Sequence, residues 1–65
     1  MRPQHQTKYV VRTAIEGALK ALNQAVDDMP YPVTPEDHEV REAAYASVQR
    51  IKDALLLELE ILELL

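Results

Sequence analysis

Large apolar side chains recur every three or four residues through the first half of the chain, which places them along one side of an α-helix. The pattern predicts a helix over residues 7–28, with Thr7 as its N-cap. Met29-Pro30 should end it, because the residue before a proline is disfavoured in helical geometry. The large stripe consists of Val11, Ile15, Leu19, Leu22, Val26 and Met29. A second stripe of small side chains beside it consists of Ala14, Ala18, Ala21 and Ala25.

The second half of the chain predicts a longer helix over residues 35–65. Thr34 is the expected N-cap, Pro35 occupies the first helical position, and Asp37 completes a capping box as a shorter substitute for glutamate. The expected seam of this helix consists of Val40, Ala44, Val48, Ile51, Leu55, Leu59 and Leu62. Its last three turns are apolar over most of their circumference, because further leucine and isoleucine side chains flank the seam there.

The connection over residues 29–34 is short and proline-rich, which suits a stiff elbow between neighbouring antiparallel helices. The chain is therefore predicted to form an all-α helical hairpin as a single domain over residues 1–65, with residues 1–6 fraying. If both helices rise equally per residue, positions whose numbers sum to about 63 should face each other. The second helix would then outrun the first by about nine residues and leave its leucine-rich end uncovered.

The small size of the chain points to a partner. With 65 residues and no cysteine, it has no disulfide and no thiolate metal site to support its core. Chains of this length rarely gain more than about 3–5 kcal/mol from their own core. We therefore expect a homo-oligomer, favouring a dimer of hairpins that forms a four-helix bundle. The expected interface comprises Ile15, Ala18, Leu19, Leu22, Val26, Val48, Ile51, Leu55, Leu57, Leu59, Ile61, Leu62, Leu64 and Leu65.

The formal net charge of −4 is unevenly distributed. Residues 1–22 carry four cations and one acid, whereas residues 23–65 carry three cations and ten acids. An antiparallel hairpin would lay the basic segment beside the acidic end of the second helix. Glu58 falls on the apolar side of that helix, and we expect it either to pair with His5, Lys8 or a cation of a partner or to sit at the edge of the seam. A polar group there that fixes the register is our hypothesis.

No arrangement of residues indicates catalysis. His38 and Glu42 share a helical face at i,i+4, which we interpret as a surface hydrogen bond, because metal-binding helices show further ligands at such spacing. Asp27 and Asp28 lack additional oxygen ligands for a cation, and there is no glycine-rich phosphate loop. We therefore expect no enzyme activity, no cofactor and no metal.

These features predict a soluble, cytoplasmic protein without a signal peptide or membrane span. Its expected role is a small protein–protein interaction or regulatory adaptor module that associates with itself and docks a partner helix. One alternative is an RNA-regulator-like hairpin dimer that binds nucleic acid, although the acidic excess counts against it. Another is an accessory subunit of an enzyme. The nucleic-acid alternative requires an exposed stripe formed by Arg2, Lys8, Arg12, Lys20, Arg41 and Arg50.

Overall fold

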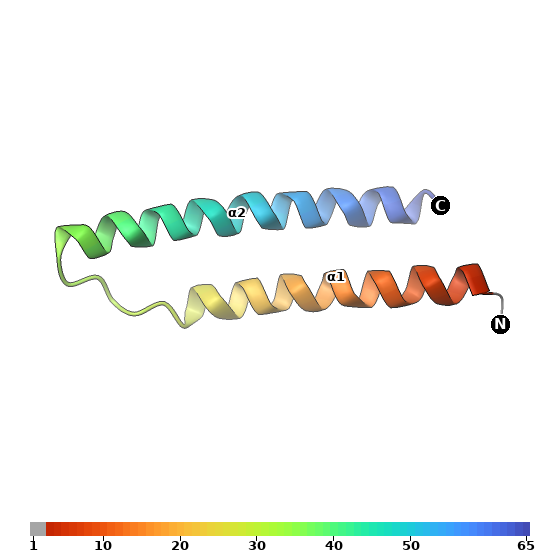
Figure 1. Ribbon diagram of the computed structural model, residues 1–65, viewed down its shortest axis with the longest axis horizontal. Helices are drawn as coiled ribbons and strands as arrows, with labels where there is room; N and C mark the ends of the chain where they lie inside the picture. Colours follow the sequence, from red (N-terminus) through yellow and green to blue (C-terminus); the bar gives the residue numbers. More distant parts are fainter. Residues whose placement is uncertain (1–2) are drawn as a thin grey trace.

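The computed structural model describes the backbone of residues 3–65 and the side chains of residues 6–65. It contains two α-helices, α1 (Pro3–Asp27) and α2 (Pro35–Glu63), which lie side by side and antiparallel (Figure 1). They form a thin rod with extents of 54 × 17 × 10 Å. The predicted all-α helical hairpin is confirmed. Neither α1 nor α2 is long and apolar enough over its described length to cross a membrane.

Helix α1 begins earlier than the sequence pattern indicates. It starts at Pro3, so Thr7 lies inside the helix and is not its N-cap. Proline is favoured at the first helical position because its fixed φ already suits the helix and its missing N–H has no helical partner there. The end of α1 is close to the prediction: the Asp28 N–H donates to the Gln24 carbonyl at 2.9 Å, just before the chain turns into the elbow.

The start of α2 is confirmed in detail. Asp37 N donates to Thr34 Oγ1 at 3.1 Å, while Thr34 N and Val33 N each donate to Asp37 Oδ2 at 3.2 Å. Pro35 occupies the first helical position. The backbone N–H groups of Val33 and Thr34 hold the pKa of the Asp37 carboxyl below its ordinary value of 3.8, because they stabilise the ionised form. The cap fixes where α2 begins.

The predicted register between the helices is wrong. Lys8 lies near Glu63, with Nζ 4.0 Å from Oε2, whereas a number sum of 63 would place it beside Leu55. The seven-residue elbow (residues 28–34) stays extended and runs along α2, so α2 begins well beyond the end of α1 (Figure 1). The overhang of α2 therefore lies at the elbow, and its C-terminal turns lie alongside the first turns of α1.

The contact between the helices is a shallow seam of half-buried side chains. On α2 this seam includes Arg41 and Lys52, whereas the predicted seam residues Val40 and Ile51 remain 69% and 48% exposed. The face of α2 that meets α1 is thus rotated by a fraction of a turn from the predicted one. Among the described residues, none is buried. The hairpin by itself has no closed core.

Candidate functional site

The two broad sides of the hairpin differ in chemistry. Successive residues of a helix are about 100° apart, so positions a quarter turn from the seam project above or below the plane of the two axes. Because the helices are antiparallel, positions rotated in the same sense from the seam lie on the same side. On one side these positions are almost all apolar or small, and we call it the apolar face. It comprises Val10, Val11, Ala14, Ala21 and Ala25 of α1, with Val40, Ala43, Ser47, Ile51, Ala54, Glu58 and Ile61 of α2.

The opposite side, the polar face, carries charged and hydrogen-bonding groups from both helices. One shallow groove there is lined by Asn23 and Asp27 of α1 together with Gln49 and Lys52 of α2. A second groove continues toward the end of the hairpin away from the elbow, which we call the open end. It is lined by Arg12, Glu16, Leu56, Leu59, Glu60 and Glu63. That these residues line shared grooves agrees with the helical geometry and places them on one side.

Most of the apolar face is open to solvent. Val10 is 63% exposed, Ile51 is 48% exposed and Ile61 is 44% exposed. The alanines on both helices and Ser47 are also exposed, and their small side chains leave the face low enough for another backbone to approach closely. A contiguous exposed apolar surface of this kind marks an interaction site or an aggregation liability.

An ionic cluster lies at the open end of the polar face. Glu63 lies 3.5 Å from Arg12 Nη1 and 4.0 Å from Lys8 Nζ. This arrangement confirms that basic residues of α1 lie beside acidic residues of α2. Both pairs are substantially exposed, so each contributes at most about 1 kcal/mol. The sequence interpretation overlooked Glu63, because the expected register placed Lys8 eight residues earlier on α2.

The predicted pairing of Glu58 with Lys8 is not observed. Lys8 reaches Glu63, and the side chain of His5 lies outside the part of the chain whose side chains are described. Glu58 is exposed, and it is the single charged residue of the apolar face where α1 and α2 overlap. Arg50, about two turns away on α2, leans toward the same face, since its Nη2 lies 3.2 Å from Ser47 Oγ.

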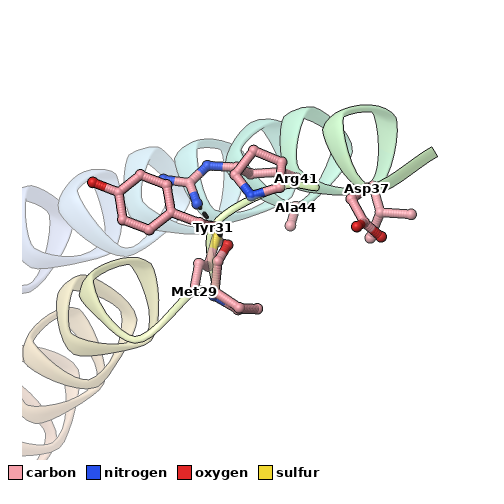
Figure 2. A pocket seen from close by; sticks show the side chains of 8 residues that line it. Met29, Tyr31, Asp37, Arg41 and Ala44 are labelled. Atoms are coloured by element: carbon pink, nitrogen blue, oxygen red, sulfur yellow. Dashed lines mark hydrogen bonds between the residues drawn. The ribbon is translucent and has the colours of Figure 1, made fainter. Parts of the chain in front are cut away.

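A pocket of about 310 Å³ lies between the elbow and the first turns of α2. Figure 2 shows Arg41 reaching from α2 toward the elbow, where Nη1 donates to the Pro30 carbonyl at 2.9 Å. The same guanidinium lies 5.3 Å from the centre of the Tyr45 ring, within cation–π range. The remaining lining is mainly apolar and includes Met29 and Tyr31. Arg41 thereby holds the extended elbow against α2, a role that the sequence interpretation missed.

The predicted interface residues divide into two groups. Those that are half-buried between α1 and α2 belong to the seam of the single hairpin: Ile15, Ala18, Leu19, Leu22, Val26, Val48, Leu55, Leu59 and Leu62. The others are exposed: Ile51 and Ile61 on the apolar face, Leu57 on the side of α2 turned away from α1, and Leu64 and Leu65 at the C-terminal end. The structure thus separates side chains that join the two helices from side chains that remain available to another molecule.

The titratable groups do not converge on one point. Within the described residues, no three His, Cys, Asp or Glu side chains are placed to share a metal ion. His38 and Glu42 are both exposed, and Asp28 accepts a hydrogen bond from Gln24 Nε2 at 3.1 Å. The cations are also dispersed: Lys8 and Arg12 lie at Glu63, whereas Arg41 lies at the elbow.

The fold and surface together define a helical hairpin with one apolar face and one polar face. Comparison of the chain with models of protein families, with curated proteins and with solved structures gives no match.

Proposed function

We propose that this chain is a small, non-catalytic interaction module that associates with itself and docks a partner helix through its apolar face. The observation that carries the proposal is the lack of any buried side chain among the described residues, although 48% of the sequence is hydrophobic. Most helical stability in proteins comes from packing of an apolar face and not from the isolated helix. This hairpin leaves one such face unpacked.

The surface area supports the same proposal quantitatively. The chain exposes 5425 Å², whereas a compact monomer of its mass, 7.4 kDa, would expose about 4,200 Å². The excess of about 1,200 Å² exceeds the roughly 800 Å² that each partner buries in a standard protein–protein interface. Covering the apolar face would therefore bring the exposed area per chain toward that of a stable globular protein.

The polar groups favour this role over the alternatives. The cations that would have to form a nucleic-acid stripe lie on different parts of the surface, and Arg12 and Lys8 are near an acid. Arg2 lies outside the described residues. The pocket at the elbow presents Arg41 and Asp37, but both are engaged, one with the Pro30 carbonyl and the other in the helix cap. The apolar face is the surface whose side chains make the fewest contacts of these kinds.

Light scattering and circular dichroism across a dilution series test the proposal. We expect a mass of at least two chains at high concentration, with helicity falling as dilution separates them. The two signals should change together, because covering the apolar face stabilises the helices. A single-chain mass at every concentration, with full helicity retained, would contradict the proposal.

A further inference from the structure

We infer that a second copy of this chain covers the apolar face, stacked face to face with its elbow at the opposite end of the rod. The inference rests on the proposed function and specifies the occupant of the surface and its orientation. Two stacking arrangements preserve twofold symmetry. In the parallel stack both elbows lie at the same end and α1 packs on α2 of the second copy. In the reversed stack the elbows lie at opposite ends, and each helix packs on its own copy.

The sizes of the side chains favour the reversed stack. Where α1 overlaps α2, the elbow half of the apolar face carries Ala25 and Ser47, whereas the open end carries Val10 and Ile61. A parallel stack would set small on small at one end and large on large at the other, which would force the helices to diverge. Reversal places the large side chains over the small ones and keeps the interhelical distance even, as close packing requires.

The charge distribution favours the same orientation. Residues 23–40, around the elbow, contain five acids and neither lysine nor arginine. A parallel stack would gather ten acids at one end of the dimer. Reversal separates the two acidic elbows along a rod 54 Å long, several times the Debye length of about 8–10 Å at physiological salt. It also brings each elbow toward the open end of the other copy, where Lys8 and Arg12 lie beside Glu63.

The lone charge on the apolar face provides the most specific argument. Because Lys8 and Arg12 lie at Glu63, the overlapping parts of the helices have their midpoints close to Gly17 and Ala54. A twofold axis through Ala54 brings residues of α2 whose numbers sum to about 108 level with each other. Glu58 then meets Arg50 of the second copy, and the pair occurs twice. The Arg50 side chain already leans toward this face through Ser47.

The midpoint of α1 also suits a close approach at the axis. A Cβ added to Gly17 would meet nothing of its own chain within 4 Å. The space beside this glycine is therefore not used inside the hairpin, although glycine in a helix interior costs about 1 kcal/mol relative to alanine. Gly17 itself lies beside the apolar face; on that face, Ala14 and Ala21 of α1 and Ala54 of α2 are the small residues near the points where the two copies cross the axis.

The orientation is tested by a distance between elbows. Tyr31 is 91% exposed and the chain has no cysteine, so a spin label on Tyr31→Cys is a selective probe of the elbow. Tyr31 lies level with Arg41, about 13 residues from the midpoint of α2, so the reversed stack predicts a label separation of about 40 Å at about 1.5 Å per residue. The parallel stack predicts about 20 Å or less, because packed helices lie about 10 Å apart.

Charge exchange tests the pairing of Glu58. We expect Glu58→Arg and Arg50→Glu each to weaken the dimer about tenfold or more, because each creates two like-charged contacts. The double exchange should restore the dissociation constant to within about threefold of the original. Glu60→Arg makes the same change of charge on the polar face and should leave the dissociation constant nearly unchanged.

The outcomes separate this inference from the proposed function. A single-chain mass by light scattering on the labelled sample would overturn both the association and the second copy as the occupant. A dimer with a short or broad elbow distance would overturn the reversed orientation while leaving self-association intact. Failure of the double exchange to recover affinity would overturn the Glu58–Arg50 pairing. A distance near 40 Å together with recovery supports the inference.

Discussion

The matched pair Ile51→Glu and Leu56→Glu offers the sharpest test of which face carries the interaction. Both side chains lie on α2 and both are 48% exposed in the single hairpin. Ile51 belongs to the apolar face, whereas Leu56 lines a groove on the polar face. Each substitution changes the formal net charge from −4 to −5, so effects of overall charge are the same. The variants differ mainly in the side of the hairpin that they alter.

The size of the effect follows from the exposed fractions. Burying a whole isoleucine or leucine side chain stabilises by about 1.5–3 kcal/mol. Since roughly half of Ile51 is still exposed, covering the remainder contributes about 1 kcal/mol per copy. A symmetric dimer loses this twice, so Ile51→Glu should cost about 2 kcal/mol and weaken association about 30-fold. Burial of an unpaired carboxylate would increase the loss further.

Sedimentation equilibrium of the two variants measures the dissociation constants directly. We expect Ile51→Glu to weaken the dimer by about 30-fold or more, and Leu56→Glu to change it by no more than about threefold. Circular dichroism at high concentration verifies that each variant still forms helix. Equal weakening by the two substitutions would refute the assignment of the interface to the apolar face, and a larger effect of Leu56→Glu would place it on the polar face.

Three further predictions concern the hairpin itself. Thr34→Ala removes the cap acceptor for Asp37 N and should destabilise α2 by about 1 kcal/mol, measured as a lower midpoint in urea. The Asp37 carboxyl has a depressed pKa, so its contribution is fully present above the ordinary value of 3.8 and is lost as pH falls through the lower folded-state value. The stability difference between the wild type and Asp37→Asn should therefore narrow in acid, as followed by thermal melts from pH 7 to pH 2, and a constant difference would contradict this role. Gly17→Ala fills open space and should raise helicity at concentrations where the chain is monomeric, with a gain of up to about 1 kcal/mol. Lower helicity of the monomeric variant would contradict this, because it would mean that the added Cβ meets another part of the same chain.

Local signals in the sequence predicted the elements well. The start of α2 depends on residues within four positions of each other, so Thr34, Pro35 and Asp37 were sufficient to locate it. The start of α1 was placed too late, because the polar first segment lacks apolar periodicity while Pro3 can still open a helix. Periodicity reports which residues pack, and it carries less information about helical turns that project from the packed region.

The register depends on a longer-range feature that local patterns do not determine. The predicted register, in which the numbers of facing residues sum to 63, requires a tight turn. The elbow instead extends along α2, where Arg41 holds it through the Pro30 carbonyl. The resulting shift places Lys8 beside Glu63 and not beside Leu55, so that Lys8 pairs with Glu63 instead of Glu58. The alanine stripe was visible in the sequence. That this stripe lies on the same side of the hairpin as the exposed apolar residues of α2 depends on how the two helices face each other, which the sequence alone does not give.

The absence of buried side chains in the described part of the chain has a consequence for how the molecule behaves at different abundances. If packing against a second copy supplies most of the stabilisation, association and folding become one equilibrium governed by mass action. The amount of chain synthesised then determines the proportion that is structured as well as the total. At low concentration the chain would be mostly unfolded and open to proteolysis, and at high concentration the associated chains would be protected. The folded fraction would then depend on how much of the chain the cell makes.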